Sequence, residues 1–336
     1  MAGTIRDVAR EAGVSQATAA RALAGYGYVS DTTLRRVRQA ATSIGYRPNA
    51  LARSLVSGAT KTIGVVLGDI ENPFFAAAAR GLADVLERDG YTLLLANSDE
   101  DLARERRAVE ALYAHQVDGL AVVPSSGDDG AHLAAILREG RPVVLLDRSI
   151  AGLDADAVLV DNRSGAERAV RHLLELGHRR IGLVGDSPGI SSTAERIDGY
   201  RAALAAAGIP ADDALVSLGG STIEQGRRSA LQLLERPDRP TALFTVNNFM
   251  TAGAMMAVRE LALRMPDELA LVGFDDLDWT TLVEPPITVV AQPVAELGRT
   301  VAELLLERIA GDQSPPREIR LRTRLVVRGS CGGGAR

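Results

Sequence analysis

The chain has 336 residues, 46% of them hydrophobic, and a net charge of −5 at pH 7. This length accommodates a small domain plus one or two larger ones with a sizeable apolar core. One cysteine, Cys331, excludes an internal disulfide framework and a cysteine-cluster zinc site and fits a reducing compartment. The histidines lack metal-ligand spacing, which favours surface positions. Without a signal-peptide core or an apolar run of roughly 18–20 residues, we expect a cytoplasmic protein with no membrane contact, metal or cofactor.

The segment from Thr4 to Gly45 predicts three short helices. Thr4 can cap the first helix, and Asp7, three positions later, completes a capping-box pattern. Gly13 can adopt the left-handed conformation that ends this helix, and Ser15 can cap the second. The third helix begins at Ser30 or Asp31. The apolar positions predicted to pack inward are Ile5, Val8, Ala9, Ala12, Ala19, Ala22, Leu23, Leu34, Val37, Ala41 and Ile44.

The second helix of this segment has an outward face made of Gln16, Ala17, Ala20 and Arg21. These side chains occupy the place where the recognition helix of a helix-turn-helix meets base edges. A small helical cap or a dimerisation bundle is the alternative interpretation. Charge favours the DNA-binding one: residues 1–60 hold eight arginines against three carboxylates, a net +5, and the remainder carries −10.

From Thr62 onward, short runs rich in Val, Leu and Ile alternate with helical patterns. Runs without strict alternation are typical of strands buried on both faces, so repeated β–α units predict doubly wound parallel sheets in two similar lobes. The expected strands are 62–69, 91–97, 118–124, 142–147, 157–160, 180–185, 214–218, 241–247, 269–275 and 287–291. The expected helices include 74–89, 101–115, 164–176, 195–207, 222–235, 249–263 and 294–310.

Ligands of such sheets bind at the carboxyl ends of the strands. The residues that follow the predicted strands are carboxylates, an arginine, amides and aromatic rings, which suit a polyhydroxylated ligand. They are Asp69–Phe75, Asp147, Arg148, Arg196, Asn247–Phe249, Asp275 and Asp276. Each also has a structural interpretation: Asp and Asn as helix N-caps, Phe74 and Phe75 as core, Arg196 as a solvated helix residue, and Trp279 as an anchor at a lobe edge.

The chain resembles lactose-repressor-type (LacI/GalR family) transcriptional regulators from Thr4 to about Ser330. The matching motifs are Thr4–Ala9, Gly13–Ser15, Thr18, Arg21, Val29–Ser30, Gly45–Ala50, Ala52–Leu55, Thr60–Gly64, Asn72–Phe75, Asp118–Gly119, Leu176–Arg179, Gly273–Asp276 and Pro285–Thr288. The resemblance implies a fold of class α/β, with an N-terminal helix-turn-helix headpiece and a two-lobed periplasmic-binding-protein-like core of doubly wound parallel sheets.

The domain boundaries implied by this resemblance place the three lobe crossings near 161, 291 and 319. The headpiece is then 1–46 and the hinge helix and linker 47–61. The core N-lobe is 62–161 with 292–318, the C-lobe 162–291 with 319–330, and 331–336 a disordered tail. The implied DNA-binding residues are Thr4, Ser15, Gln16, Ala17, Thr18, Arg21, Asn49, Ala52 and Leu55. The implied effector-binding residues are Phe74, Asp147, Arg196, Asn247 and Asp275.

The sequence departs from the usual family pattern in its second helix, where Thr18 to Ala24 reads Thr-Ala-Ala-Arg-Ala-Leu-Ala. Polar phosphate contacts expected at 20 and 24 are absent, and the headpiece core is underfilled. Asn248 replaces a common aspartate, which disfavours an effector that needs a charge there. The tail has no leucine heptad, so we expect a homodimer. Residues 49–57 are too few for a stable isolated helix and are expected to fold when two copies pair over the minor groove.

We therefore expect a DNA-binding transcriptional regulator, a repressor whose affinity for a pseudo-palindromic operator in double-stranded DNA is controlled by a sugar-like effector between the lobes. An extracytoplasmic sugar-binding receptor would share the core fold but needs a signal peptide in place of the basic head. An enzyme on this fold would need a phosphate loop, a nucleophile elbow or a metal cluster. The motifs G-x-x-x-x-G-K-[ST] and G-x-G-x-x-G are absent, and G-x-S-x-G occurs once, at Gly185–Gly189.

Overall fold

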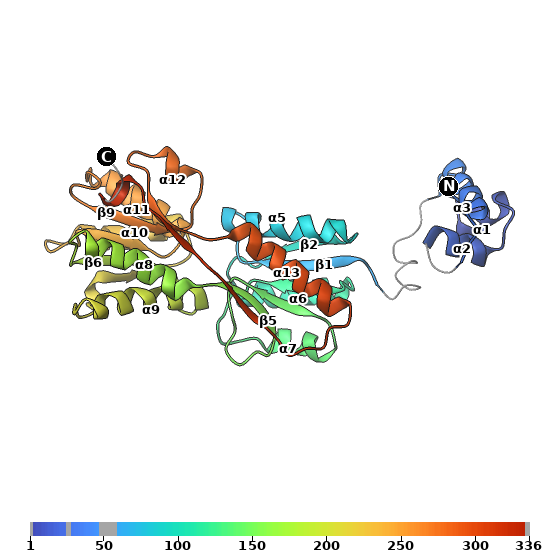
Figure 1. Ribbon diagram of the computed structural model, residues 1–336, viewed down its shortest axis with the longest axis horizontal. Helices are drawn as coiled ribbons and strands as arrows, with labels where there is room; N and C mark the ends of the chain where they lie inside the picture. Colours follow the sequence, from blue (N-terminus) through green and yellow to red (C-terminus); the bar gives the residue numbers. More distant parts are fainter. Residues whose placement is uncertain (1–2, 25–27, 47–58, 333–336) are drawn as a thin grey trace. The chain divides into compact units, whose positions relative to one another are not determined.

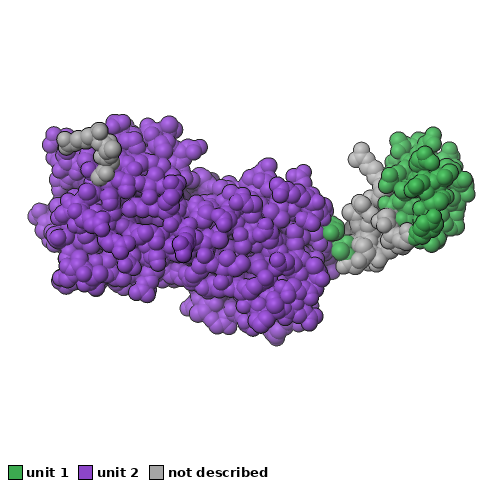
Figure 2. Space-filling view, in the orientation of Figure 1, with its two compact units in different colours: residues 1–61 green, residues 62–336 purple. Residues whose placement is uncertain are grey.

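The computed structural model describes residues 3–24, 28–46 and 59–332. The chain divides into two compact units, residues 1–61 and 62–336, which are coloured separately in Figure 2. The expected hinge residues Asn49, Ala52 and Leu55 lie outside the described residues. Among the helices that the structure describes, none is both long and apolar enough to cross a membrane.

The described part of the first unit contains three helices, α1 (Ile5–Glu11), α2 (Gln16–Ala24) and α3 (Asp31–Ser43). Thr4 and Asp7 form the capping box that their spacing predicts, and Gly13 ends α1 with a φ of +61°. Ser30 caps α3 by accepting a hydrogen bond from the backbone N–H of Thr33. Local sequence signals therefore set the helix ends in this unit.

The apolar core of the headpiece is small. Six of its eight buried residues are alanines, and seven larger apolar residues pack against them partly buried. The eight are Val8, Ala9, Ala12, Ala19, Ala22, Val37, Ala40 and Ala41. Arg36 of α3 also joins the helices, since its guanidinium donates hydrogen bonds of 2.5 and 3.2 Å to the carbonyl of Ala12 at the end of α1. Polar contacts thus supplement a core with little apolar surface.

The second unit consists of two lobes, each built on a six-stranded sheet covered by helices (Figure 1). The N-lobe sheet has the order β11-β5-β4-β3-β1-β2, and all its pairings are parallel. Its strands are β1 (Thr62–Leu67), β2 (Thr92–Asn97), β3 (Gly119–Val122), β4 (Val143–Leu146), β5 (Asp156–Val160) and β11 (Glu318–Leu321). Its helices are α5 (Pro73–Arg88), α6 (Leu102–Ala114), α7 (Ala131–Arg138) and α13 (Val294–Ile309).

The C-lobe repeats this arrangement with the order β12-β10-β9-β8-β6-β7, in which only β12 pairs antiparallel. Its strands are β6 (Ile181–Gly185), β7 (Val216–Leu218), β8 (Ala242–Thr245), β9 (Ala270–Phe274), β10 (Thr288–Ala291) and β12 (Arg324–Val326). Its helices are α8 (Asn162–Glu175), α9 (Ser191–Ala206), α10 (Ile223–Leu234), α11 (Asn248–Glu260) and α12 (Trp279–Leu282), with 3₁₀ turns Asp213–Leu215 and Gly329–Cys331.

The two-lobed parallel fold predicted from the alternating pattern is confirmed. The sequence did not predict α7, α12, β11 or β12. These elements are short, and β11 and β12 have mixed polar and apolar residues with no fully buried position. β11 and β12 lie at sheet edges, where a strand does not need the continuous apolar run of a central strand.

The chain crosses between the lobes at residue 161, between Ala291 and Val294, and at residues 322–323. Figure 1 shows the last crossing as the dark red segment that connects β11 and β12. The third crossing was expected near 319, and the structure corrects it. Glu318–Leu321 pairs with β5, so these residues belong to the N-lobe sheet and not to the C-lobe.

Two further expectations are wrong. Cys331, predicted to begin a disordered tail, is 3% exposed in the C-lobe core, where its sulfur lies 3.2 Å from His172 Nε2 and 3.0 Å from Thr288 Oγ1. Residues 333–336 of that tail lie outside the described residues. The histidines were expected on the surface, but His172 packs against this thiol and His132 contacts the buried carboxylate of Glu105 at 2.8 Å. Tertiary packing at both places supplies partners that spacing along the chain does not reveal.

Candidate DNA-reading face and ligand crevice

The predicted outward face of α2 is exposed. Gln16, Ala17 and Arg21 are all accessible, whereas Ala19 and Ala22 on the opposite face are buried. The Ser15 hydroxyl accepts a 3.1 Å hydrogen bond from the backbone N–H of Thr18, which fixes the start of the helix. The structure therefore brings Ser15, Gln16, Ala17, Thr18 and Arg21 together at one surface of the headpiece.

Thr4 and several arginines around this face already have partners within the headpiece. The Thr4 hydroxyl donates a 2.7 Å hydrogen bond to Asp7, which also pairs with Arg10. Arg36 is committed to the carbonyls at the end of α1. Exposed arginines also lie at Arg6, Arg21, Arg35 and Arg38. The sequence charge count therefore overstates the cations that can meet a phosphate.

The second candidate site is the crevice between the two lobes of the core. The lobes contact each other through hydrogen bonds from Asn248 Nδ2 to Asn72 Oδ1 (2.9 Å) and from the Ser149 N–H to Ser191 Oγ (3.0 Å). A cavity of about 550 Å³ opens between Asp69–Glu71 and Asn97–Glu100 of the N-lobe and Gly220–Gln225 of the C-lobe. The crevice lies at the carboxyl ends of the parallel strands, where ligands of this fold class bind.

Asp147 and Arg148, directly after β4, are buried on the N-lobe side of the crevice; neither lines the cavity, which Arg148 contacts through Glu100. Arg148 holds Glu100 through two N–H donors at 2.5 and 2.8 Å, donates to the carbonyl of Pro124 and stacks over the Phe75 ring. Asp147 Oδ1 is buried without a hydrogen-bond partner in the described structure.

The C-lobe wall is organised around Arg196, which is 4% exposed. Its guanidinium donates to Asn162 Oδ1 at 2.8 Å and to the carbonyl of Val246 at 2.7 Å, and it lies 3.8 Å from the Phe274 ring centroid. These contacts make Arg196 a rigidly held group, so the interpretation as a solvated helix residue is wrong.

Asn247 and Asp275 continue this wall. Asn247 caps α11 with its oxygen and donates its amide N–H to Asp186 Oδ2 at 2.8 Å. Asp275 Oδ2 accepts hydrogen bonds from the backbone N–H and the amide of Asn248, and Asp275 Oδ1 accepts from Gln292. The N-cap interpretation is therefore correct for Asn247, whose amide nitrogen is in turn bonded to Asp186.

The backbone at two of these carboxylates is strained. Asp147 and Asp275 have φ values of +67° and +77°, in the left-handed region that non-glycine residues rarely adopt. Such conformations persist where the surrounding structure enforces them, and they cluster at ligand sites. The strain supports a functional role for both residues.

Burial changes the acidity of the crevice. Desolvation raises the pKa of Asp147 to about 6. The positive charges of Arg196 and Arg148 oppose this rise, and the negative charges of Asp275 and Glu100 add to it. Burial also raises the pKa of Asp186. Asp147 therefore lies close enough to Arg196 and Asp275 of the opposite lobe for their charges to affect its pKa.

Phe74 is placed differently from the other predicted effector residues. It is 5% exposed within the N-lobe core and meets Phe75 edge to face at 5.2 Å. Its N–H is capped by Asn72, the residue that reaches across to Asn248. Most of the Phe74 side chain therefore belongs to the N-lobe core.

Sequence reasoning missed four polar residues of the crevice: Glu100, Asn162, Asp186 and Gln292. Three of them, Asn162, Asp186 and Gln292, lie within two residues of the end of a strand. The rule that selected Asp147 and Asp275 would also have selected these three. Glu100 lies three residues beyond β2 and is identified only by its contact with Arg148.

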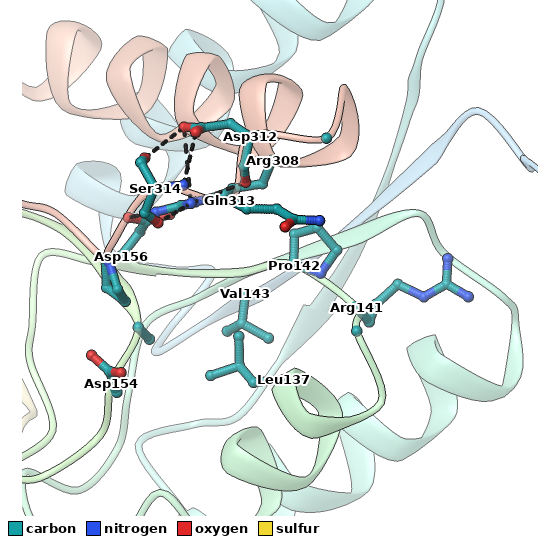
Figure 3. Close-up of a pocket in the computed structure, with 14 residues that line it drawn as sticks. Leu137, Arg141, Pro142, Val143, Asp154, Asp156, Arg308, Asp312, Gln313 and Ser314 are labelled. Atoms are coloured by element: carbon teal, nitrogen blue, oxygen red, sulfur yellow. Dashed lines mark hydrogen bonds and ion pairs between the residues drawn. The ribbon is translucent and has the colours of Figure 1, made fainter.

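A separate hollow of about 470 Å³ lies at the other end of the N-lobe (Figure 3). Arg308 of α13 binds Asp156 there through two N–H donors at 2.6 and 2.9 Å and also holds the carbonyls of Asp312 and Ser314. None of the predicted site residues lines this hollow. Its polar groups fasten the end of α13 to the sheet.

Comparisons with known proteins agree with this two-part organisation. The family described as bacterial regulatory proteins, lacI family, matches residues 4–49, and the periplasmic binding protein-like domain matches residues 170–331. The HTH-type transcriptional regulator PtxS of Pseudomonas aeruginosa is 39% identical over 329 residues, covering 97% of this chain and 95% of the relative.

Two solved structures align over almost the whole chain. The transcriptional regulator CelR–cellobiose complex is 32% identical with a TM-score of 0.75, and the lac repressor dimer bound to operator and the anti-inducer ONPF is 26% identical with a TM-score of 0.87. Each alignment covers 98% of this chain and 99% of the other. The described relatives are transcription factors, which is consistent with the expectation that the chain is not an enzyme.

Proposed function

The chain belongs to the lacI family of bacterial regulatory proteins and is a DNA-binding transcriptional regulator; from that premise we propose that it is a cytoplasmic repressor whose operator affinity is controlled by a sugar-like effector in the crevice. The observation that carries this proposal is the joint presence of an exposed polar face on α2 and a buried polar crevice between two lobes. In this assignment the headpiece is 1–46, the linker 47–61, and the remainder the effector-binding core.

The DNA-reading part of the proposal assigns base contacts to three exposed side chains of α2. Arg21 offers a two-donor fork to guanine, Gln16 pairs with adenine, and Ala17 contacts a thymine methyl group. Ser15, Thr18 and Thr4 hold the helix start against the phosphate backbone. The fork of Arg21 is worth about 1–3 kcal/mol of discrimination at one position in each half-site.

Selection from randomised operators tests this assignment. Arg21→Ala should relax base preference at one position per half-site, while Arg38→Ala, which removes an exposed arginine from α3, should weaken binding to all sequences alike. Equal base preference with and without Arg21 would reduce Arg21 to a phosphate contact.

Asn49, Ala52 and Leu55 enter the proposal through the family resemblance alone. We assign Leu55 as an apolar wedge in the minor groove, where unstacking a base step kinks the duplex. Leu55→Ala should lower specific affinity by up to a few kcal/mol and leave non-specific binding unchanged. Gel shift on operator and on random DNA measures the two quantities separately.

The effector part of the proposal rests on Asp147, Arg196, Asn247 and Asp275, with Phe74 at the edge of the site. Carboxylates and a guanidinium held in fixed positions are suited to hydroxyl groups, and the related regulator CelR was solved with cellobiose. Arg196→Ala and Asp275→Ala should abolish the response of operator binding to the effector with little change in the affinity of the free protein. Titration of operator with each variant, with and without an effector found by thermal-shift screening, tests this; responses like the parent's would overturn the assignment.

We propose that the functional unit is a homodimer on a pseudo-palindromic operator. β2 is an edge strand of the N-lobe with Leu94 and Leu95 exposed, and β7, the corresponding edge of the C-lobe, exposes Leu218. Unpaired apolar edges on a soluble domain favour a partner surface. Sedimentation should give a dimer for the parent and a monomer for the double variant Leu94→Asp and Leu95→Asp; a dimeric variant would locate the interface elsewhere.

A further inference from the structure

We propose that the crevice selects an uncharged or cationic hydroxylated effector and excludes sugar acids and sugar phosphates. The inference rests on the proposed role of the crevice as the effector site and specifies the charge of the ligand it accepts. Three independent features support it: the balance of charges on the walls, the kind of polar atom left without a partner, and the composition of the cavity mouth.

The walls contain more carboxylates than cations. Four acidic residues, Glu100, Asp147, Asp186 and Asp275, share the crevice with two arginines, Arg148 and Arg196. All but the half-buried Glu100 are at most 6% exposed, so solvent screens them weakly. At pH 8, above the pKa of about 6 of Asp147, an excess of negative charge remains even with Asp186 protonated, because Glu100, Asp147 and Asp275 outnumber the two arginines.

Both arginines are already committed to the protein. Arg148 donates two hydrogen bonds to Glu100 and a third to the Pro124 carbonyl, and Arg196 donates to Asn162 and the Val246 carbonyl. A phosphate or carboxylate ligand is normally bound by an arginine fork that faces it with both donors free. These bonds occupy three of the five N–H donors of Arg148 and two of the five of Arg196, which reduces the number left for an anion.

The atoms that lack partners are mainly acceptors. Asp147 Oδ1 and Gln292 Oε1 are buried with no hydrogen-bond partner in the described structure, and Asp147 is 4% exposed. Among the described crevice residues, one buried donor also lacks a hydrogen-bond partner: Arg148 Nε, which lies 3.6 Å from Asp147 Oδ2. A buried acceptor needs a donor. Hydroxyl and ammonium groups supply donors, whereas an ionised acid group supplies only further acceptors.

The 550 Å³ cavity shares Glu100 with the crevice, and we take this cavity as the crevice mouth; its lining has the same sign. Of the ten residues around the 550 Å³ cavity, four are acidic, Asp69, Glu71, Asp99 and Glu100, and none is basic. Asp99 pairs with Arg104 and Glu100 with Arg148, while Asp69 and Glu71 form no ion pair within the described part of the chain. A negative entrance lowers the local concentration of anions and raises that of cations.

The expected discrimination is large. A ligand charge about 5 Å from one surplus carboxylate, at an effective dielectric constant of about 20, changes affinity by roughly a hundredfold. Neutral sugars avoid this repulsion, and amino sugars gain from the same field.

The experiment is calorimetric titration of the full chain, at pH 8 and without DNA, with matched sets of glucose, galactose and ribose. Each set contains the neutral sugar, its 2-amino form, its aldonic acid and its terminal phosphate. For a skeleton that binds, the neutral or amino form should bind about a hundredfold more tightly than the acid and the phosphate. An acid or phosphate that binds as tightly as its neutral parent, or a panel in which no neutral or amino form binds at millimolar concentration, would overturn the inference.

Asp147→Asn provides the internal test. Removing one surplus negative charge should abolish most of the roughly hundredfold gap in affinity between neutral and anionic forms. Asp154→Asn, which removes an exposed charge from the same lobe outside the crevice, should leave the gap unchanged. Equal gaps in the parent and the Asp147 variant would contradict the charge argument.

The same ligands then separate this inference from the proposed function. A neutral sugar that binds with the expected discrimination but leaves operator affinity unchanged would refute effector control and keep the charge rule. An anionic sugar that binds and alters operator affinity would keep effector control and overturn the charge rule.

Discussion

The headpiece and the core are stabilised in different ways. The buried core of the headpiece consists of six alanines and two valines, whereas the C-lobe core alone buries Tyr200, Phe244 and Phe274 completely. A domain of this size with so little apolar volume is marginally stable. Its helices therefore depend on the Thr4–Asp7 capping box, the Ser30 cap and the Arg36 bridge, while the core depends on packed sheets.

This contrast has a functional reason. A headpiece held by individual polar contacts can open without disturbing the core, because local unfolding follows local contact density. Polar groups in the core have two other roles. The Arg308–Asp156 pair joins α13 to the sheet, and burial destabilises the charged forms of Asp147 and Asp186 in the crevice. A single substitution should therefore change the stability of one region only, and the size of that change should differ greatly between sites.

The largest effect is expected at Arg308. Asp156 is 4% exposed and receives two N–H donors from Arg308. Arg308→Ala leaves a buried carboxylate without its partner and should lower the free energy of unfolding of the core by about 3–5 kcal/mol. Urea denaturation of the full chain measures it, and Arg299→Ala, an exposed arginine on the same helix, serves as the control. Equal midpoints for both variants would contradict the prediction.

The next effect is expected at Asp147, and it depends on pH. Burial raises the pKa of this carboxyl to about 6, so the folded state binds a proton that the unfolded chain has released between about pH 4 and 6. Stability from this group is present at low pH and is lost as the pH rises through 6. Asp147→Asn cannot ionise, so it avoids this loss of stability. Above pH 7 the variant should be more stable than the parent by up to about 3 kcal/mol.

Thermal denaturation of the parent and of Asp147→Asn from pH 5 to 8 gives the comparison. The difference in Tm should grow with pH and level off above pH 7. Asp154→Asn should show no such trend. A difference that is constant with pH would indicate a packing effect and not relief of a buried charge.

A smaller effect is expected at Arg36, confined to the headpiece. Its guanidinium binds the Ala12 carbonyl and so joins α3 to the end of α1. Arg36→Ala should lower headpiece stability by about 1–2 kcal/mol, because a hydrogen bond from a charged donor is lost. Hydrogen exchange should accelerate in α1 and α3 and remain unchanged in β1 and β3; acceleration in both units would contradict their independence.

The smallest effect is expected at Thr4. Thr4→Ala removes the side-chain half of the capping box and should destabilise α1 by about 1 kcal/mol. Thr4→Ser keeps the hydroxyl and is the control. Exchange rates of the α1 amides measure both variants, and protection equal to the parent in the alanine variant would show that the Asp7 contacts suffice.

The sequence alone determined the headpiece helices, the alternation of strands and helices and the two lobes. Caps, glycine stops and apolar periodicity act over a few residues, so Thr4, Gly13 and Ser30 mark helix ends without reference to the rest of the chain. The strand-end rule likewise located Asp147, Asn247 and Asp275. These features follow from local backbone and side-chain physics.

The tertiary structure decided the partners. Nothing near Arg148 in the sequence indicates that Glu100 occupies its guanidinium, or that Asn162 and Phe274 hold Arg196. The same holds for Cys331, which packs beside His172, and for β11, which joins the N-lobe sheet. Charge and hydrogen bonding act through space, between residues that only the packed lobes bring together, and so the ligand charge that the crevice accepts is set by the fold.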